Sequence, residues 1–399
     1  MNVVLFDGPE WEDLLPLTYT RPVAGLRIGI DTILDKWNAA LNTECQVWTR
    51  SYLQDFYPLS ASGDCLMINA AYLPNNFLAD SVLLLEQGQR LEINGQVVAA
   101  RKAFDKDILF SPETPGLSPH PIAIVTHEIV HHIAYPWHLF AMNDTVLRQD
   151  FARITRNRTS ESLSGTNQII GEDIFAEKGA KAECSTINTA TGPVYLGANS
   201  EIMEGAIIRG GLALCEGSSV KMGAKLYGAN TFGPHCKIGG EVTNSIFQEF
   251  SNKGHDGYLG NSVIGAWCNF GADTNSSNLK NNYKKVRIFN YRTDTMIDSG
   301  QQFLGLIMGD HSKTGINTML NTGTVVGVSS NIFGAGFPPS HIPSFAWGGG
   351  NRFETYQIEK ALEVAAAVMA RRNVSLTAGD KTLLRYIFDH TAKYRPAFH

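Results

Sequence analysis

A bulky apolar residue recurs at every sixth position of the chain from Leu196 onward. Eight consecutive positions of the series follow the rule without a miss: Leu196, Ile202, Ile208, Leu214, Val220, Leu226, Phe232 and Ile238. Because 43% of the residues are hydrophobic, chance would produce such a run from a fixed start roughly once in a thousand trials. The same period returns in a second run: Met308, Thr314, Leu320, Val326 and Ile332, with Thr314 as its weak member. The period predicts a repeat architecture.

The residue four places after each bulky one is usually small. Examples are Ser200, Ala206, Ser218, Ala224, Ser312, Thr318, Thr324 and Ser330, whereas Leu212 and Asn230 break the rule. A period of six fits a triangular coil in which each face takes one inward apolar residue and each tight corner a small one. We therefore predict a left-handed parallel β-helix over about residues 196–333, an exception to the right-handed crossover rule. A right-handed β-helix or a sandwich is the alternative, but sandwiches alternate with period two.

The 399 residues are enough for two or three domains, and the front of the chain has a different rhythm. Short apolar strands alternate there with helical patches, which favours an α/β sheet domain. Expected strands are Val3–Phe6, Cys65–Ile68 and Ser81–Leu85, and expected helices are Thr32–Leu41 and Trp137–Ile154 behind Pro136. We predict an α/β domain over 1–165, a β-helix domain over 166–345 and a helical tail over 346–399.

The tail carries two helical patterns, Phe353–Arg371 and Leu383–Tyr394. A capping signal at Thr377 and Asp380 precedes the second. Since the open end of a β-helix exposes unpaired edges, we expect this pair to pack against the end of the coils.

Composition excludes several classes of function. The net charge is −5, from 33 basic and 38 acidic residues, and no basic run exceeds two, which argues against nucleic-acid binding. No run of eighteen apolar residues suggests a membrane span, and the acidic residues near the start do not fit a secretory signal. A soluble, cytoplasmic protein is expected. The six cysteines are dispersed, so neither a disulfide framework nor a zinc ribbon is indicated.

Two polar stretches, residues 251–260 and 269–284, interrupt the repeat, and we expect both to project from the coils. The first contains His255. Taken alone, this histidine could equally be a loop residue that only bonds backbone or a general base for an amine, since histidine titrates near neutral pH.

The residues of these stretches carry a specific resemblance. The strings Asn-Lys-Gly-His-Asp-Gly-Tyr-Leu-Gly from Asn252, Trp-Cys-Asn-Phe-Gly-Ala from Trp267, and Ser-Asn-Leu from Ser277 resemble the acetyltransferase half of the bifunctional GlmU enzymes. The whole chain, from Leu5 to about Trp347, resembles a GlmU-like branch often labelled glucose-1-phosphate thymidylyltransferase or sugar nucleotidyltransferase. The resemblance implies a nucleotidyltransferase-like domain followed by a trimeric, left-handed β-helix acyltransferase domain.

The resemblance also implies roles for single residues. His255 matches the catalytic histidine of the family. Substrate contacts of the family would fall on Tyr258, Asn269 and Asn278, and acetyl-CoA contacts on Ala272 and Gly334. Lys253 and Lys284 would bind the sugar phosphate as point charges. The family's phosphate-gripping arginine and lysine have no clear match, because Tyr227 and Ser245 stand near those places, and Leu279 replaces a family tyrosine. Amine acylation is thus better supported than the identity of the sugar.

In the front domain the resemblance implies nucleotide contacts at Gly8, Arg21, Arg27 and Asn69. The family's glycine-rich, basic loop is acidic here, and Val23 stands in place of its lysine. Four carboxylates would repel a triphosphate unless Mg²⁺ lay between them.

A further motif, His127-Glu-Ile-Val-His131, spells a zinc-protease signature. Its β-branched flanks favour a strand, in which histidines four apart are too distant to share one zinc, and Pro136 would cut a helix short. We predict no metal site there.

The sequence therefore predicts an acetyl-CoA-dependent N-acetyltransferase for an amino-sugar 1-phosphate, most readily glucosamine 1-phosphate, joined to a sugar-1-phosphate nucleotidyltransferase-like domain. It would be a homotrimer in nucleotide-sugar synthesis that binds an amino-sugar phosphate and a nucleoside triphosphate. One alternative is a uridylyl- or thymidylyltransferase whose β-helix only builds the oligomer. Another is a catalytically inactive regulatory scaffold.

Overall fold

The computed structural model describes residues 2–104, 121–123, 129–350 and 352–395. The chain forms two compact units. The first comprises residues 1–14, 20–26 and 31–138, and the second residues 15–19, 27–30 and 139–399. The second unit thus includes two short segments from the front of the sequence.

The first unit is built on a mixed six-stranded sheet. Its strand order is β2 (Gln46–Trp48), β1 (Asn2–Phe6), β3 (Gly63–Asn69), β5 (Gln96–Phe104), β4 (Arg90–Ile93) and β6 (Pro121–Ala123). Strand β1 is parallel to both neighbours, whereas β5 is antiparallel to both β3 and β4. Its helices are α1 (Glu10–Asp13), α2 (Ile33–Leu41), α3 (Ser51–Gln54) and α4 (Asn76–Leu83), with a 3-10 turn at Val23–Gly25. The α/β class is confirmed.

Two predictions in this unit had different outcomes. The helix expected over Thr32–Leu41 is α2, and Thr32 caps it by accepting a hydrogen bond from the backbone N–H of Asp35. The strand expected over Ser81–Leu85 is wrong, because those residues end helix α4, which Asn75 caps through the N–H of Leu78. Leu83 and Leu84 are exposed, so the apolar run that suggested a buried strand is only partly buried.

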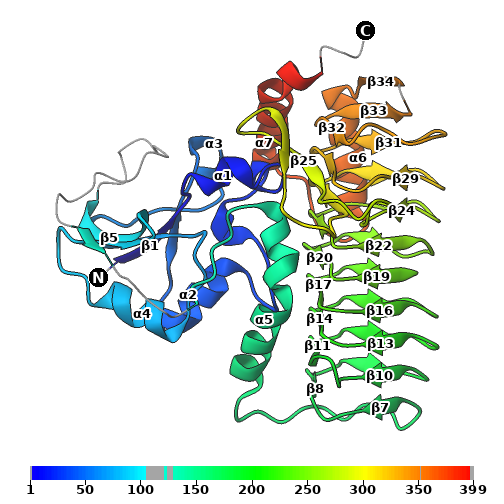
Figure 1. The fold of residues 1–399 in the computed structure, drawn as a ribbon, viewed down its shortest axis with the longest axis horizontal. Coiled ribbons are helices and arrows are strands. Elements are labelled where there is room, and N and C mark those ends of the chain that lie inside the picture. The colour runs from blue at the N-terminus through cyan, green and yellow to red at the C-terminus, as the bar shows by residue number, and fades with distance from the viewer. Residues whose placement is uncertain (1, 105–120, 124–128, 351, 396–399) are drawn as a thin grey trace. The chain divides into compact units, whose positions relative to one another are not determined.

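The second unit is a parallel β-helix, and Figure 1 shows its coils stacked from β7 and β8 to β33 and β34. The first sheet contains β7 (Gln168–Ile170), β10 (Thr186–Asn188), β13 (Ile207–Arg209), β16 (Lys225–Tyr227), β19 (Glu241–Thr243), β22 (Tyr258–Gly260), β24 (Asn275–Ser276) and β29 (Met319–Leu320). The second contains β8 (Ile174–Ala176), β11 (Val194–Leu196), β14 (Leu212–Leu214), β17 (Asn230–Phe232), β20 (Ile246–Phe247), β23 (Val263–Ile264), β27 (Leu306–Met308), β30 (Thr324–Val326) and β32 (His341–Ile342).

The third sheet has two parts joined by Asn269, which bridges Asn252 and Lys313. The parts contain β9 (Lys181–Ala182), β12 (Glu201–Ile202), β15 (Ser219–Val220), β18 (Lys237–Ile238) and β21 (Asn252–Lys253), then β28 (Lys313–Thr314), β31 (Asn331–Ile332), β33 (Ala346–Gly349) and β34 (Arg352–Thr355). Strand β34 turns back antiparallel to β33.

The register explains the period of six. Leu196 pairs with Leu214, and Leu214 with Phe232, so three hexads make one coil. The residues of both predicted runs are buried inside the stack, including Thr314, and the small corner residues are buried as well. The predicted left-handed β-helix is confirmed.

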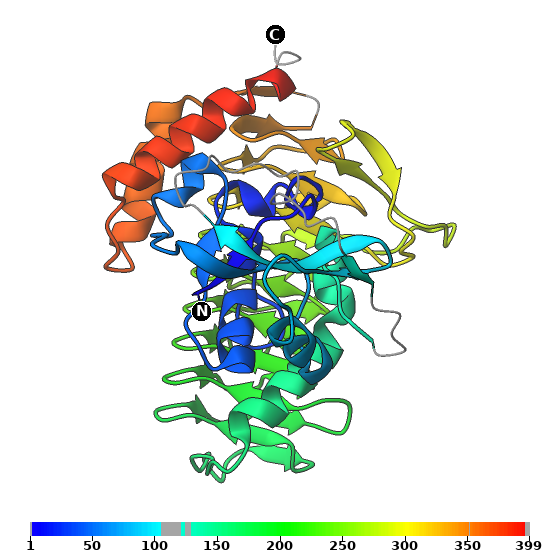
Figure 2. The same cartoon turned by 90° about the vertical axis from the view of Figure 1, so that its left-hand side faces the viewer.

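One expectation about the polar stretches is wrong. Residues 251–260 do not project, since they carry β21 and β22, which pair in register with β18 and β19. Ile238 pairs with Lys253, so this coil has fifteen residues where three hexads would give eighteen. The shorter coil breaks the six-residue period in the sequence. The true excursion begins near Leu279, which bridges Phe303, and contains the hairpin of β25 (Arg287–Asn290) and β26 (Thr295–Asp298). In Figure 2 this hairpin lies at the side of the coils, and Phe289 of β25 stacks on His341 of β32 with their ring centroids 3.6 Å apart.

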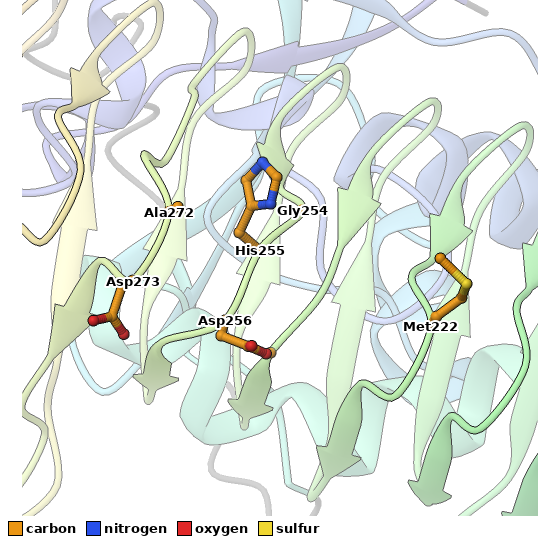
Figure 3. Close-up of a pocket in the computed structure, with 7 residues that line it drawn as sticks. Met222, Gly254, His255, Asp256, Ala272 and Asp273 are labelled. Carbon is orange, nitrogen blue, oxygen red and sulfur yellow. The ribbon is translucent and has the colours of Figure 1, made fainter.

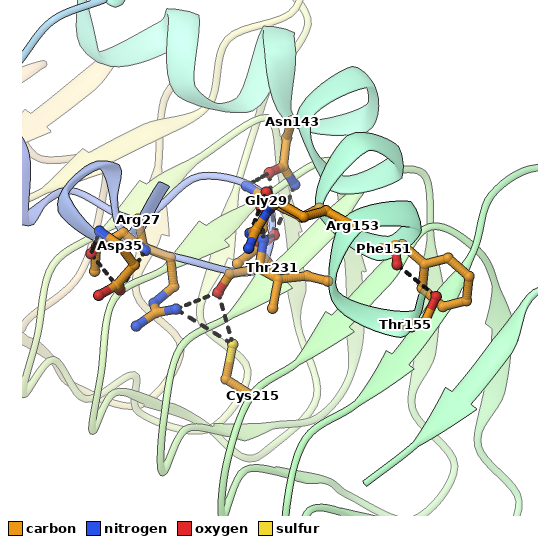
Figure 4. Close-up of polar contacts among 12 residues, drawn as sticks. Arg27, Gly29, Asp35, Asn143, Phe151, Arg153, Thr155, Cys215 and Thr231 are labelled. Atoms are coloured by element: carbon orange, nitrogen blue, oxygen red, sulfur yellow. Dashed lines mark hydrogen bonds and ion pairs between the residues drawn. The ribbon is translucent and has the colours of Figure 1, made fainter. Parts of the chain in front are cut away.

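Helices flank the coils of the second unit. Helix α5 (Pro136–Thr155), as predicted behind Pro136, carries the chain into this unit. In Figure 4, the segment around Gly29 is bound between α5 and the coils: its N–H donates to Asn143 Oδ1 at 2.8 Å, and its carbonyl accepts from Thr231 Oγ1 at 2.7 Å. The side chain of Asn143 donates in turn to the carbonyl of Ala229 at 3.1 Å.

The tail folds as α6 (Ile358–Ala370) and α7 (Ala378–His390). The prediction that a helix starts at Phe353 is wrong, since this residue lies in β34. The predicted cap is confirmed, because Thr377 and Asp380 form a reciprocal capping box on α7. Met369 of α6 packs in one cluster with Ala266 and Trp267 of the coils.

Candidate functional site

His255 lies at the edge of an open pocket of about 460 Å³ in the second unit. The pocket is lined by Met222, Gly240, Gly254, His255, Asp256, Ala272 and Asp273. The turn between β21 and β22 presents His255 and Asp256, and both side chains are exposed. In Figure 3 the imidazole of His255 points away from the carboxylates of Asp256 and Asp273. Across the described chain, the ring makes no hydrogen bond, so both of its nitrogens are available to a ligand.

The two aspartates come from neighbouring coils. The backbone N–H of Asp273 donates to the carbonyl of Asp256 at 3.0 Å, which fixes the two turns side by side. We did not predict either residue. The signal for the pair was the length of one coil: Leu259 pairs with Ser276 seventeen residues later, and Asp256 and Asp273 have the same separation. With two carboxylates beside it, the pocket favours a cationic ligand group.

Lys253 lies beneath the pocket rather than in it. Its side chain is 1% exposed and points into the column of inward-facing residues. Its Nζ donates to the carbonyl of Gly239 at 3.2 Å and to that of His255 at 3.0 Å. Burial lowers the pKa of Lys253 to about 8, against the opposing effect of Asp256 and Asp273. Direct contact with a sugar phosphate, as expected from the sequence, would require this ammonium to leave the core.

Tyr258 and Asn278 form a second group near the pocket. The half-buried Tyr258 lies on β22, where its N–H donates to Asn275 Oδ1 at 2.7 Å. Burial raises the pKa of the Tyr258 hydroxyl, and a hydrogen bond with Asn278 opposes this effect. Asn278 also donates to Asn261 Oδ1 at 2.8 Å.

The other predicted residues of this unit are less closely joined to His255. Ala272 lines the same pocket. Asn269 is exposed on the third sheet, Lys284 is exposed in the excursion after Leu279, and Gly334 is exposed at a corner with open space around its Cα. Among the described residues, no hydrogen bond connects these three to the imidazole.

In the first unit, Gly8 and Asn69 meet at the ends of β1 and β3. Asn69 Nδ2 donates to Glu10 Oε2 at 3.2 Å, and Glu10 Oε1 lies 2.7 Å from His132 Nε2. Burial alone would raise the pKa of Glu10, but the hydrogen bonds from His132, from its own backbone and from Asn69, together with the charge of His132, lower it. A Cβ on Gly8 would lie 2.3 Å from Glu10 Oε2, so a larger residue here would force the side chains of Glu10 and Asn69 to shift. Sequence reasoning missed the Glu10–His132 pair, because 122 residues separate them.

Asp7 is the second buried acid of this loop. It accepts hydrogen bonds from the N–H of Val23 at 2.8 Å and from Thr49 Oγ1 at 2.5 Å. Burial nevertheless raises its pKa to about 6.

The two arginines predicted to contact nucleotide lie in different units. Arg21 is buried in the first unit. Arg27 belongs to the second, where its N–H donates to Gln248 Oε1 at 3.1 Å and its guanidinium donates to the carbonyl of Ile30 and contacts Cys215 Sγ (Figure 4). These contacts bind Arg27 to the coils.

The zinc-protease motif falls largely outside the described residues, which include neither His127 nor Glu128. Within the described ranges, no group of three or more His, Cys, Asp or Glu side chains could hold a metal ion. Asn69 Nδ2 donates to Glu10, and Asn69 Oδ1 accepts from the N–H of Ala71.

Comparison with known proteins agrees with both halves of the chain. Residues 3–159 match the family model described as sugar nucleotidyl transferase. The chain is 38% identical over 99 residues to the bifunctional sugar-1-phosphate nucleotidylyltransferase/acetyltransferase of Sulfurisphaera tokodaii, which covers 24% of each chain. The chain is therefore similar to GlmU-type bifunctional proteins over part of its length. It is also 27% identical over 183 residues to the bifunctional protein GlmU of Synechococcus elongatus, covering 44% of this chain and 36% of that one.

The chain spans about a quarter of the length of the Sulfurisphaera tokodaii relative, since 24% of that protein is covered. Among solved structures, the UDP-N-acetylglucosamine acyltransferase from Campylobacter jejuni aligns over 58% of this chain and 95% of its own, with 13% identity and a TM-score of 0.23. A score this low says nothing about function. No helix in the described ranges combines the length and apolar character needed to cross a bilayer.

Proposed function

We propose that the chain is an acetyl-CoA-dependent N-acetyltransferase that acts on an amino-sugar 1-phosphate, with glucosamine 1-phosphate as the first candidate. The observation that carries the proposal is the exposed His255 imidazole, unbonded within the described chain, at a pocket shared with Ala272. The GlmU-like family adds support, because the relatives are bifunctional enzymes by name.

The chemistry assigns one task to each group. An amino sugar is an ammonium in neutral water, and Asp256 and Asp273 favour its approach. After the ammonium loses one proton to water, the amine nitrogen attacks the thioester carbonyl, and His255 takes a second proton from the nitrogen as the C–N bond forms. When the C–S bond breaks, the imidazolium returns that proton to the departing thiolate. Backbone N–H groups would stabilise the oxyanion formed between these steps.

The proposed enzyme is a cytoplasmic homotrimer whose acyl sites lie between subunits. Two exposed apolar side chains support this part of the proposal, one of which lines the pocket. Met222 lines the pocket and is 71% exposed, and Ile316 is also 71% exposed, next to Asn317, whose N–H donates to the carbonyl of Ala272. Large apolar side chains this exposed are typical of surfaces that a partner covers. A neighbouring subunit would also supply the ring of His255 with the hydrogen-bond partner that it lacks here.

The experiment follows free thiol release from acetyl-CoA in the presence of a panel of amino-sugar phosphates. His255→Ala should lower kcat/KM by about a hundredfold or more, the usual contribution of a general base. His390→Ala is the matched control, since this exposed histidine lies on α7 in contact with Tyr386. Equal activity of the His255 variant and the wild type would refute the proposal.

A second candidate activity is sugar-1-phosphate nucleotidyl transfer by the first unit. The match of residues 3–159 to the sugar nucleotidyl transferase family favours it. Pyrophosphate release from UTP or dTTP should then persist in His255→Ala. Release of pyrophosphate without any acetyl transfer would instead support the reading in which the β-helix only builds the oligomer. If neither acetyl-CoA nor nucleotide binds in calorimetry, the inactive scaffold is favoured.

A further inference from the structure

Lys253 occupies a position where the other coils of the lower stack have an aliphatic residue. It pairs with Ile238, which pairs with Val220, which pairs with Ile202, so all four side chains belong to one inward column. On the following coil, Asn269 forms a parallel β-bridge with Asn252, so Phe270 is the next residue of the column after Lys253. An ammonium group in such surroundings is costly unless hydrogen bonds replace its lost water.

The side chain of Lys253 donates two hydrogen bonds, both to backbone carbonyls. Its Nζ donates to the carbonyl of Gly239 on the preceding coil and to the carbonyl of His255 on its own coil. The contact is close, since a Cβ on Gly240 would lie 2.8 Å from Nζ, and Gly240 has a φ of +69°. The ammonium therefore joins the main chain of His255 to the coil below.

The turn has few other attachments on its own backbone. The carbonyls of Asp256 and Gly257 accept from Asp273 and Glu241, at 3.0 and 3.2 Å. The carbonyl of His255 itself is held by Lys253. A methionine would fill the same column without holding that carbonyl, so packing alone does not explain a lysine here.

We propose that Lys253 is a positioning residue, whose buried ammonium holds the main chain of His255 so that the imidazole faces the acyl-transfer pocket. The expected change in kcat rests on the proposed function, whereas the expected movement of the turn that carries His255 does not. The depressed pKa of Lys253 agrees with this place in the core. Lys253 touches neither substrate nor the reacting atoms in this role.

The central test is Lys253→Met, which keeps the length of the side chain and removes its donors. Because misplacing a catalytic group by ~1 Å can cost about a hundredfold, kcat should fall by about ten- to a hundredfold. Both KM values should stay within about twofold, since the groups that bind substrate remain. Lys253→Gln, which keeps an N–H donor, should recover part of kcat. Lys181→Met makes the same change on β9 of the same sheet, away from the pocket, and should leave kcat unchanged.

Thermal unfolding separates positioning from packing. Replacing a buried charge by an apolar side chain of similar volume is often neutral or stabilising, so Lys253→Met should melt no lower than the wild type. A lower melting temperature, with activity lost only in proportion to unfolded protein, would show a structural role and overturn the inference. An unchanged kcat would do the same.

A crystal structure of Lys253→Met provides a readout without activity. The inference expects the Cα of His255 to move by ~1 Å or the turn at 254–257 to lose definition. If the turn superimposes on that of the wild type, the inference fails whether or not the protein transfers acetyl groups. If the wild type transfers no acetyl group but the turn moves in the variant, the proposed function fails and the hold of Lys253 on the turn stands.

Discussion

Asp7 is a carboxyl group whose protonation is coupled to folding. Its folded pKa of about 6 lies above the ordinary value of 3.8, mainly because of burial. The folded state therefore binds more protons than the unfolded state between these two values, and the stability that Asp7 contributes is lost as pH rises through this window. At pH 7 the buried carboxylate remains as a destabilising charge.

Asp7→Asn should remove this pH dependence. The amide oxygen can still accept from the N–H of Val23, and the amide NH2 can donate to the hydroxyl oxygen of Thr49, which would turn over its present role as donor. The variant should therefore be more stable than the wild type above pH 6, by at most about 3 kcal/mol. Calorimetric unfolding between pH 4 and pH 8 measures the difference. A gap between the two proteins that stays constant from pH 4 to pH 7 would contradict the assigned cause.

The residues of the site show what a single sequence can reveal. His255 was found from its place in a polar string, and Ala272 from the family resemblance. Asp256 and Asp273 required the register of neighbouring coils, which the shortened coil at Lys253 hides. The pair of Glu10 and His132 joins residues 122 positions apart, and no local pattern announces such a contact.

At the scale of elements, helix α7 depends on its first turn. Thr377 Oγ1 accepts from the N–H of Asp380 at 3.1 Å, and Asp380 Oδ2 accepts from the N–H of Thr377 at 2.8 Å. Such boxes satisfy N–H groups that the helix itself leaves unpaired. The tail therefore has a local source of order besides its packing.

Thr377→Ala should cost about 1 kcal/mol in the stability of α7. The amides of its first turns should then exchange with solvent about fivefold faster, as measured by mass spectrometry. Thr382→Ala is the matched control, because Thr382 lies within the same helix and bonds only the carbonyl of Ala378. Equal exchange in the two variants would mean that packing, and not the cap, holds the start of α7.

The elements differed in how well the sequence predicted them. The β-helix was readable because each coil repeats one inward position, and α2 and α7 were readable from their caps. Strand β34 was mistaken for the start of a helix, since its Phe353 precedes an alanine-rich pattern in the sequence. The end of helix α4 was predicted as a strand, because the helix is short and its last apolar residues, which are partly exposed, form a brief apolar run in the sequence.

At the scale of the whole molecule, the proposed trimer makes a prediction about mass. The wild type should sediment at three times the 43.7 kDa of the chain. Met222→Glu combined with Ile316→Glu should give monomers and abolish acetyl transfer, because a carboxylate buried at an interface without a partner is strongly unfavourable. Met222→Leu with Ile316→Leu is the control. A trimer that survives the glutamates would place the interface elsewhere.

The chain leaves its coils after Asn278 and rejoins them at Leu304, so that Ile264 pairs with Met308 although 44 residues separate them. Each coil takes its register only from the coils directly before and after it, so the length of this excursion does not change the register of the other coils. Natural or engineered sequences of quite different size could therefore replace the hairpin, and the coils on either side would still close upon one another.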